Sequence, residues 1–455
     1  MTKKPSWLVG VARKTINPAP GVELAGLGYF LNRTWDRIHD DLHATALVIT
    51  DEFGKSVALL ALDLLYADTE FVEGIRNQVA NSTGLRPQDV CINCSHSHNA
   101  PTLAFFDGAG EIDRDYAQKV VASAAEAIDS AWRHRLPARL QVGYERLPGV
   151  TYNRTREGGP VDDRVSVLRA DSLNGQPIAV VVNFHAHPTV FWQVEMRSVS
   201  RDCPGQIVDL LEKELQGVTA LYLQGSCGDV NFLLEYWTKE RYTEAGKLVF
   251  EAAMSALSNS REVQAPGSGA ITLQGRLPVR RWTREEVLGM YKEGRHRLAT
   301  GDTSGWLEGI ASTMVGLPAR LPERYSGSVE KAVEAVSRFA VRWAEDVLPK
   351  IDQMSETREM EFQAMRIGDV WFAVNPTELF SSLALELRRR WPHDDLFIVG
   401  YSNGAASYLP DAYEIDRGSY ASLQVPRAIR ACPFTRNAGM VAVAEMVATL
   451  QALTR

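Results

Sequence analysis

Short apolar runs alternate with longer amphipathic segments along almost the whole chain. Runs of alternating or continuous apolar residues predict strands. The predicted strands are residues 7–12, 42–50, 56–63, 90–94, 139–147, 164–170, 177–184, 221–223, 359–367, 370–375 and 396–401. Apolar positions spaced by about four residues, such as Phe71, Ile75 and Val79, predict helices. The predicted helices are residues 68–82, 114–134, 204–215, 238–258, 283–299, 328–348, 376–391 and 438–452.

Strands and helices alternate in this pattern, but some neighbouring strands are joined as hairpins. Residues 42–63 form one predicted hairpin and residues 359–375 another. Hairpins require antiparallel pairing, whereas helices between strands favour parallel pairing. We therefore expect an α/β protein in which helices flank a mixed β-sheet.

Residues 262–330 differ in composition from the rest of the chain. Proline, glycine, serine and arginine become frequent there, and Trp282 and Trp306 fall within the range. We interpret this range as a lid or insertion whose loops cap the active face. No repeat, low-complexity tract or linker divides the sequence, so residues 1–455 are expected to form one large domain.

The composition is that of an ordinary globular protein, with 45% hydrophobic and 23% charged residues. A net charge of -7 leaves no basic stripe to neutralise phosphates, which argues against a nucleic-acid partner. No segment approaches the roughly 20 apolar residues of a membrane span. Five scattered cysteines are typical of free thiols, so we expect a cytoplasmic protein. The oligomeric state is unknown at this stage.

Four of the nine histidines stand in two H-x-H pairs, each directly after an apolar run. The pairs are His96 with His98 and His185 with His187. Side chains two residues apart on an extended strand project to the same face, so each pair would point into one pocket. A metal site built from imidazoles requires such a concentration of histidines. Histidines that only hydrogen-bond loops at strand ends are the alternative.

A series of motifs resembles the amidase domain of the neutral/alkaline non-lysosomal ceramidase family. In the family's order, the motifs are GVARKTINP (10–18), HDDL (39–42), SHSHNAP (95–101), NFHAHP (183–188), GSCGDV (225–230), NPTE (375–378) and GYSN (400–403), followed by Tyr408. A set in this order is far more specific than any one motif. The resemblance covers the amidase domain and does not extend to the family's carboxy-terminal β-sandwich.

In the ceramidase family, two histidines, a glutamate and a tyrosine hold zinc. Transferred motif by motif, the resemblance implies one Zn²⁺ per chain, held by His96, His187, Glu378 and Tyr408. This donor set leaves the ion residual positive charge and an open position for water. Local sequence allows other roles. Glu378 could complete a capping box at the start of a helix, and Tyr408 could be a core tyrosine.

The residues around the implied ligands indicate how a bond would be cleaved. His98 faces the pocket without being a ligand and is a candidate for proton transfer. Tyr408 could also stabilise an oxyanion. The ceramidases have a serine important for catalysis after Gly-Asp-Val, where this chain has Asn231, which cannot be an acyl nucleophile. We therefore expect attack by metal-bound water. The Gly228 loop and the Asn231 amide would face a substrate oxygen, unless the loop is an ordinary glycine turn.

Five further residues complete the candidate site. Arg154 lies in a stretch similar to one of the family and could hold a substrate carboxylate or polar head, with a surface ion pair as the alternative. His185 is interpreted as pocket lining, and Asn403 is a substrate-binding candidate from its motif. Asp63 and Asp202 are candidates for orienting a metal ligand, and Asp202 could instead be a helix N-cap.

These features predict a zinc-dependent hydrolase that cleaves an amide or similar carbonyl bond, an ester or lactone included, in a small soluble substrate. The missing serine, β-sandwich and secretion signal argue against ceramide itself. A metal-dependent lyase or isomerase acting on a polyol-like substrate is a second hypothesis. A non-catalytic ligand-binding protein on the same fold is the third.

Overall fold

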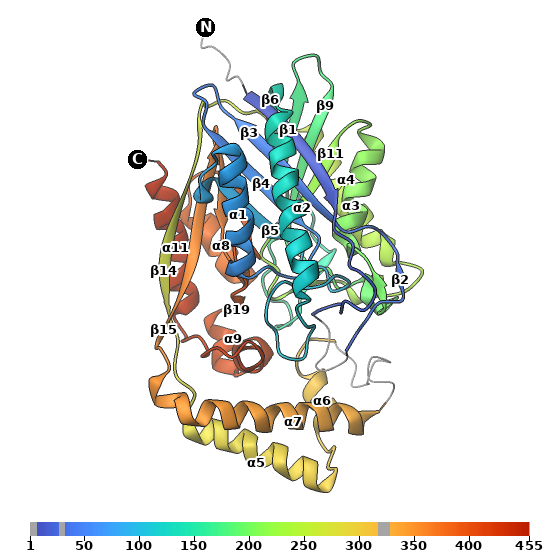
Figure 1. Ribbon diagram of the computed structural model, residues 1–455, viewed down its shortest axis with the longest axis vertical. Coiled ribbons are helices and arrows are strands. Elements are labelled where there is room, and N and C mark those ends of the chain that lie inside the picture. Colours follow the sequence, from blue (N-terminus) through green and yellow to red (C-terminus); the bar gives the residue numbers. More distant parts are fainter. Residues whose placement is uncertain (1–6, 27–31, 317–327, 455) are drawn as a thin grey trace.

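Two β-sheets lie face to face at the centre of the molecule, with helices on their outer sides (Figure 1). The computed structural model describes residues 7–26, 32–316 and 328–454. The larger sheet has nine strands in the order β11-β9-β8-β6-β1-β3-β4-β5, with β13 paired to β6. Its strands are β1 (Trp7–Thr15), β3 (His43–Thr50), β4 (Ser56–Leu62), β5 (Val90–Cys94), β6 (Leu136–Arg146), β8 (Arg164–Ser172), β9 (Pro177–Phe184), β11 (Thr219–Gln224) and β13 (Arg261–Glu262).

The smaller sheet has four strands in the order β14-β15-β16-β18. They are β14 (Ser268–Pro278), β15 (Thr357–Ile367), β16 (Val370–Val374) and β18 (Leu396–Val399). Three short pairs lie outside both sheets. They are β2 (Arg37–Ile38) with β10 (Ser198–Val199), β7 (Thr151–Asn153) with β12 (Val230–Phe232), and β17 (Thr377–Leu379) with β19 (Ser407–Leu409).

The helices fall into three groups along the chain. The first four are α1 (Thr69–Thr83), α2 (Arg114–Arg133), α3 (Asp202–Glu214) and α4 (Tyr242–Ser258). The next three, which we call the helical arm, are α5 (Arg284–Thr300), α6 (Trp306–Ala311) and α7 (Val329–Val347). The last are α8 (Ser381–Arg390), α9 (Ala412–Arg417), the π-helical turn η6 (Tyr420–Gln424), α10 (Val425–Ala428) and α11 (Ala438–Ala452).

The layers explain why many strands are apolar throughout. All seven side chains of β4 are buried, because helices cover one face of the larger sheet and the smaller sheet covers the other. Between the sheets, Leu47 and Val181 belong to the same cluster as Phe372 and Phe397. Outside them, α1 to α4 cover the larger sheet, and α8 and α11 cover the smaller one. The fold is therefore a helix–sheet–sheet–helix sandwich.

The predicted class, a mixed β-sheet flanked by helices, is confirmed, but the hydrophobic pattern does not reveal that there are two stacked sheets. One predicted element is wrong at its start. The helix expected over residues 376–391 begins only at Ser381, because Thr377–Leu379 pairs in parallel with Ser407–Leu409 as β17. A partner strand about thirty residues away along the chain overrides the local helix-start pattern.

The helical arm projects from the end of the sandwich at the bottom of Figure 1. α5 and α7 pack together over a small core of their own, in which Trp282 and Trp343 meet edge to face at 5.1 Å. The range predicted as a lid or insertion therefore contains β14, a strand of the smaller sheet, before it continues into the arm. Residues 317–327 of that range lie outside the described residues.

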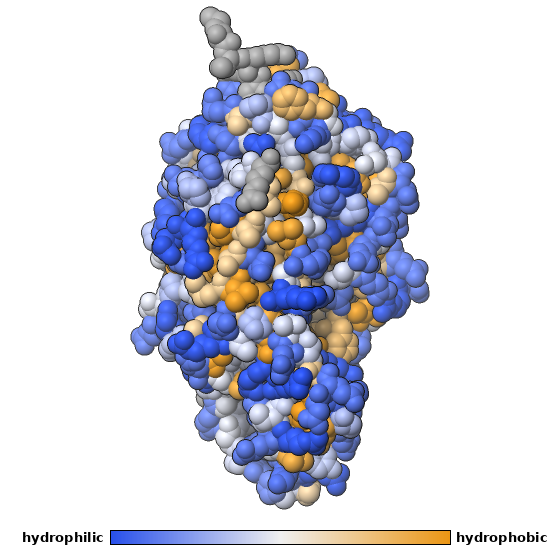
Figure 2. Space-filling model, turned by 90° about the vertical axis from the view of Figure 1, so that its left-hand side faces the viewer, coloured by the Kyte–Doolittle hydropathy of each residue, from blue (hydrophilic) through white to orange (hydrophobic). Residues whose placement is uncertain are grey.

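The surface in Figure 2 is mostly hydrophilic, with hydrophobic residues gathered along the middle of its upper half. Among the described residues, no helix is both long enough and apolar enough to cross a membrane. All five cysteines are free thiols, and burial raises the pKa of Cys91 to about 12. The C-x-x-C spacing of Cys91 and Cys94 therefore lies within a buried strand and forms no disulfide.

Candidate metal centre

The chain leaves the larger sheet before it reaches either H-x-H pair. β5 ends at Cys94 and β9 ends at Phe184, so neither strand extends to the histidines that follow it. His96 instead adopts a φ of 64°, which is uncommon for residues other than glycine. Its backbone N–H donates to the carbonyl of Leu64 at 2.9 Å. A turn, rather than strand alternation, brings His96 and His98 together.

Three imidazoles converge at this turn. The Nε2 atom of His96 lies 3.2 Å from Nε2 of His187 and 3.3 Å from Nε2 of His98. The ligand atoms of the three residues lie within 4.8 Å of one another, and all three side chains are buried. This group could hold a metal ion.

The other ring nitrogen of each histidine, Nδ1, lies against a backbone carbonyl. The pairs are His96 with Leu65 at 3.1 Å, His98 with Gly26 at 2.8 Å, and His187 with Cys227 at 2.6 Å. Because a carbonyl only accepts, Nδ1 carries the proton and Nε2 presents a lone pair. Burial lowers the pKa of His98 well below its ordinary value and that of His187 to about 3, which keeps these rings neutral. Metal-binding histidines are oriented in this way.

Glu378 places a carboxylate beside the imidazoles. Its Oε2 lies 3.3 Å from Nε2 of His187 and 3.5 Å from Nε2 of His96. The Tyr66 hydroxyl donates to Oε1, and the Tyr401 hydroxyl donates to Oε2 at 3.3 Å. Glu378 lies on β17 rather than in the first turn of a helix, so the capping-box interpretation is wrong. Strand pairing and two phenols hold the carboxylate toward the histidines.

Arg154 brings a buried guanidinium to the same place, with 4% of the residue exposed. Its Nη2 donates to the Tyr408 hydroxyl at 2.7 Å and to the Gly228 carbonyl at 2.9 Å. The same Nη2 lies 3.4 Å from Nε2 of His187, and Nη1 donates to Oδ1 of Asn231 at 3.3 Å. All these partners are uncharged, and the side chain is not on the surface. The positive charge therefore lies beside the imidazole of His187, and the surface ion pair considered for Arg154 does not form.

Tyr408 and Asn231 are organised around this arginine. The Tyr408 hydroxyl contacts Arg154, while its ring stacks on the His187 ring at 6.4 Å between centroids. Asn231 directs Nδ2 toward Sδ of Met314 at 3.8 Å, and its backbone bridges to that of His187. The structure thus places both predicted residues at the centre, on the Arg154 side.

The loop from Gly225 to Asn231 supplies acceptors to two of the central side chains, through the carbonyls of Cys227 and Gly228. Gly228 has no room for a side chain, because a Cβ there would lie 2.4 Å from the carbonyl oxygen of Glu378. Asp229 anchors the loop by accepting from the backbone N–H of Ser381 at 2.7 Å. This loop is therefore more than an ordinary glycine turn, since its backbone holds the site together.

His185 does not join the three imidazoles, although its partner in the motif does. Its Nδ1 accepts from the backbone N–H of Ser226 at 2.9 Å, and its Nε2 lies 3.5 Å from Oδ2 of Asp162. Arg388 donates to the same Asp162 oxygen at 2.7 Å. His185 is fully buried in this network, so its contacts differ from those of His187, and its role as pocket lining stays a prediction. The strand ends at Phe184, and the two histidines of this pair diverge.

The Asp162 network gives a stability prediction. We expect Asp162→Ala to lower the free energy of unfolding by about 3–5 kcal/mol, because it removes a buried carboxylate and leaves the Arg388 guanidinium, whose side chain is only 14% exposed, without its charged partner. Burial alone would raise the pKa of Asp162, but His185 and Arg388 together hold it at about 2, so the carboxylate is ionised. Urea unfolding followed by circular dichroism measures the loss.

The matched control is Asp209→Ala, which removes another arginine–carboxylate contact. Asp209 accepts from Arg201 at 2.8 Å, but its side chain is 57% exposed. An exposed pair contributes at most about 1 kcal/mol. Equal losses for the two variants would contradict the buried-charge explanation.

Two other predicted residues, Asn403 and Asp202, hold backbone segments instead of facing the imidazoles. Asn403 accepts from the backbone N–H of Ile92 and donates to Gln363, both at 2.9 Å, which ties β5 to β15. Asp202 begins α3 and accepts from the backbone N–H of Phe191 at 2.9 Å. It is not the N-cap, and His187 Nδ1 bonds to a carbonyl rather than to Asp202.

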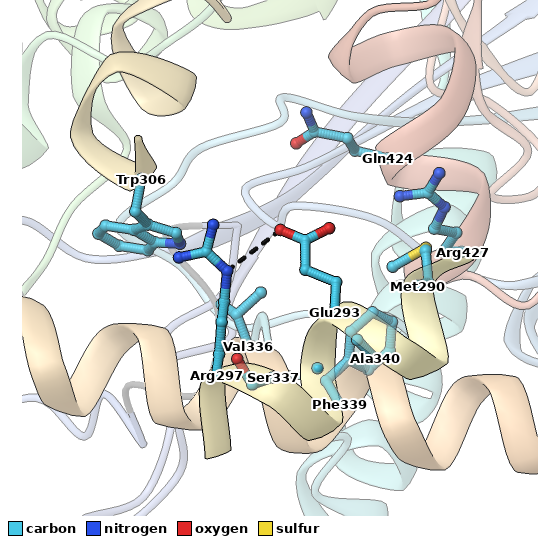
Figure 3. A pocket seen from close by; sticks show the side chains of 11 residues that line it. Met290, Glu293, Arg297, Trp306, Val336, Ser337, Phe339, Ala340, Gln424 and Arg427 are labelled. Atoms are coloured by element: carbon cyan, nitrogen blue, oxygen red, sulfur yellow. Dashed lines mark hydrogen bonds and ion pairs between the residues drawn. The ribbon is translucent and has the colours of Figure 1, made fainter. Parts of the chain in front are cut away.

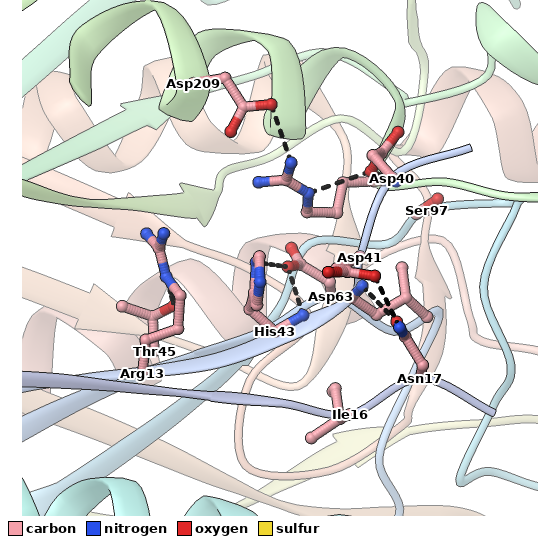
Figure 4. A network of polar contacts seen from close by, with 12 residues as sticks. Arg13, Ile16, Asn17, Asp40, Asp41, His43, Thr45, Asp63, Ser97 and Asp209 are labelled. Carbon is pink, nitrogen blue, oxygen red and sulfur yellow. Dashed lines mark hydrogen bonds and ion pairs between the residues drawn. The ribbon is translucent and has the colours of Figure 1, made fainter. Parts of the chain in front are cut away.

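Asp63 and the two aspartates of the HDDL motif, Asp40 and Asp41, belong to a network of polar contacts (Figure 4). Asp63 accepts from the backbone N–H of His43 at 2.9 Å, and burial raises its pKa to about 6. Asp40 accepts from Ser200 Oγ at 2.6 Å and from Arg201 Nε at 3.0 Å. Ser97, next to both histidines of the first pair, donates to the Ser200 carbonyl at 2.6 Å. Through Ser200, the contacts of the HDDL motif stabilise the turn that contains His96 and His98.

Sequence reasoning missed three residues that contact the central residues. Tyr66 and Tyr401 hold Glu378, and Arg33 donates to the carbonyl of His98. Tyr401 stands inside the GYSN motif, which was a usable signal. Tyr66 follows an apolar strand, and Arg33 lies in a loop. Nothing in their local sequence marks either of them.

Comparison with known proteins yields structural matches alone, since no protein-family model and no curated protein match the chain. The neutral ceramidase from Pseudomonas aeruginosa matches with a TM-score of 0.71 at 18% identity, over 99% of this chain and 75% of that one. A ceramidase complexed with C2 matches with a TM-score of 0.72 at 16% identity, over 99% and 76% of the two chains. The expected resemblance is confirmed at the level of structure: this chain has the fold of the neutral ceramidases.

Proposed function

We propose that this protein is a zinc-dependent hydrolase that cleaves an amide or similar carbonyl bond in a small substrate. The observation that carries the proposal is the meeting of His96, His98 and His187 beside the carboxylate of Glu378, on a ceramidase fold. The first two histidines and the third come from separate strand ends, and Glu378 comes from β17. Side chains so far apart in sequence and so deeply buried are typical of a built site.

The residues fit the ion. Neutral imidazoles and a carboxylate are the donors that Zn²⁺ takes in catalytic sites, and the Nδ1 contacts leave Nε2 unprotonated on each ring. His96, His187 and Glu378 would be ligands. Tyr408 is the predicted fourth, and His98 is placed as closely as the other two histidines. When bound, Zn²⁺ polarises a carbonyl and lowers the pKa of a coordinated water to about 7.

The side chains of the chain itself would orient the substrate and stabilise charge. Arg154 and the Tyr408 hydroxyl are joined by a 2.7 Å hydrogen bond and form a positive, donor-rich side of the centre. Negative charge that develops on a carbonyl oxygen there would be stabilised by both. Asn231 accepts from Arg154 and would keep the guanidinium in place. His98, if not a ligand, would accept a proton at Nε2 and pass it to the leaving group.

Further observations support a small substrate and a reducing cellular compartment. The centre is buried, with Tyr408 and His98 only 7% and 8% exposed, which favours a small substrate group at the reacting bond. The structures that match are described as ceramidases, but the resemblance leaves the serine unmatched at Asn231. A small amide, ester or lactone is therefore proposed. Five free thiols support a reducing compartment such as the cytoplasm.

The experiment that tests the function combines metal analysis with isotope labelling. Purified protein should contain about one zinc per chain by mass spectrometry. A panel of N-acyl amides, esters and lactones is then incubated with the zinc-loaded protein in H₂¹⁸O. A hydrolase places ¹⁸O in the acid product, whereas a lyase or isomerase places none. Unlabelled product would overturn the hydrolase proposal, and metal-free protein with full ligand binding would favour a non-catalytic protein.

A further inference from the structure

The helical arm reaches the metal centre through the residues that follow α6. In Figure 1, α6 lies between the long helices of the arm and the sandwich. Beyond α6, the backbone N–H of Val315 donates to the carbonyl of Arg154 at 2.7 Å, and the Tyr152 hydroxyl donates to the carbonyl of Val315 at 3.3 Å. Tyr152 lies on β7, and Arg154 follows directly after that strand. These two contacts fix the backbone of the arm beside Arg154.

Met314, the residue before Val315, directs its side chain at Asn231. Its Sδ accepts from Nδ2 of Asn231 at 3.8 Å. Asn231 is fully buried, whereas Met314 is only half-buried. The methionine side chain therefore lies between this buried amide and the surface of the molecule.

Arg154 determines which end of the Asn231 amide faces Met314. A guanidinium has donors alone, so Nη1 of Arg154 requires the acceptor Oδ1 of Asn231, which lies at 3.3 Å. The donor Nδ2 is then left to face a thioether, which is a weak acceptor. Burial raises the pKa of Tyr152, and the neighbouring Asn231 amide and Arg154 partly oppose that rise. Moving the Met314 side chain aside would therefore break only a weak hydrogen bond.

We propose that Met314 is a specificity-determining residue of the metal centre, because its side chain forms the wall on the Asn231 side and limits the size of the substrate group that fits beside Arg154. This role rests on the proposed function, since it requires the substrate to bind at the imidazoles. A methionine side chain is unbranched and has three rotatable bonds, so such a wall adapts to small differences in shape. It favours a compact group, such as acetyl, over an aromatic ring.

Hydroxamates of two sizes test the role of Met314 without requiring turnover. A hydroxamate chelates Zn²⁺ through its paired oxygen atoms, and oxygen is among the donors that Zn²⁺ accepts. Acetohydroxamate carries a methyl group at the carbonyl, whereas benzohydroxamate carries a ring. Calorimetric titration of the zinc-loaded full chain gives a Kd for each, and the ratio of the benzohydroxamate Kd to the acetohydroxamate Kd measures the size preference.

Three substitutions of Met314 change this ratio in different directions. Met314→Ala removes the wall and should lower the ratio at least about fivefold, since each methylene of difference in an apolar pocket is worth about tenfold or more. Met314→Trp enlarges the wall and should raise the ratio at least about fivefold. Met314→Leu has a similar volume and should keep the ratio within about twofold of the unaltered chain.

The matched control is Met290→Ala, which shortens another methionine of the arm. Met290 is also half-buried, but it lines a cavity of about 200 Å³ between α5, α7 and α10 (Figure 3). This variant should leave the ratio within about twofold of the unaltered chain. Circular dichroism and metal analysis confirm that every variant is folded and holds zinc. An equal drop in the ratio for Met290→Ala and Met314→Ala would overturn the assignment to Met314.

Failure of this role and failure of the proposed function give different results. If both hydroxamates bind and Met314→Ala leaves the ratio unchanged, the role of Met314 is overturned and the proposed function stands. If neither hydroxamate shows zinc-dependent binding to the unaltered chain, the proposed metal centre is overturned together with the role of Met314.

Discussion

Replacing His187 with alanine is expected to abolish metal binding and to lower kcat/KM for hydrolysis by more than about 1,000-fold. The Nε2 atom of His187 lies within 3.3 Å of both His96 Nε2 and Glu378 Oε2, so it stands at the centre of the donor set. Without His187, the metal ion would have one imidazole ligand fewer. Metal content after dialysis is measured by mass spectrometry, and activity is measured on the substrate found by the panel.

The matched control is His185→Ala, which removes the other histidine of the same motif. His185 is equally buried, but its partners are Ser226 and Asp162, so the variant should keep its metal once it is shown to be folded. A His187→Ala protein that still holds about one metal ion per chain would contradict the proposed ligand set.

His98→Ala then decides between two roles for the second histidine of the first pair. If His98 is a ligand, the variant loses metal as His187→Ala does. If it moves protons, the variant keeps its metal and loses roughly 100- to 10,000-fold in kcat. The distances favour neither role. Nε2 of His98 lies 3.3 Å from Nε2 of His96, and Nε2 of His187 lies almost as close to the same atom, at 3.2 Å.

Arg154→Ala is expected to reduce kcat by about 100- to 1,000-fold while the metal content stays unchanged. The guanidinium is buried, bonded to uncharged groups and directed at the metal centre, so its charge would act on the reacting carbonyl. Arg154→Lys should recover little of the loss, because an ammonium cannot bond Gly228, Tyr408 and Asn231 in the same plane. Steady-state kinetics and metal analysis measure both effects.

The neighbouring Arg156 offers a control within the same motif. It is half-buried and lies over the Tyr413 ring at 4.8 Å. Arg156→Ala should leave kcat within about twofold of the unaltered protein. The role given to Arg154 fails if its removal leaves kcat unchanged, or if the metal is lost together with the activity.

Much of the fold was predictable because burial on both faces leaves a strong local signal. β4 and β9 read as strands from their continuous apolar residues, and α2 from its helical spacing. The apolar pattern of a strand does not reveal whether a helix or a second sheet covers its buried face. For that reason the sequence predicts one flanked sheet, whereas the structure stacks two, with Leu47 and Phe372 in one apolar cluster between them.

The candidate site was also predictable only in part. The two H-x-H pairs were expected to face one pocket each, as on an extended strand, but both strands end before the histidines. His96 and His98 still meet, through a turn with a positive φ, while His185 and His187 separate into different networks. A two-residue spacing is informative only while the backbone stays extended.

The sequence by itself determined the class of fold, the residues able to bind a metal, and the resemblance whose motifs include His96, His187 and Glu378. These follow from periodicity and from side-chain chemistry, which are local properties. The tertiary structure alone decided that Glu378 lies on a strand, that Tyr66 and Tyr401 hold it, and that Arg154 points inward. Each depends on contacts between segments far apart in the chain, which local sequence does not encode.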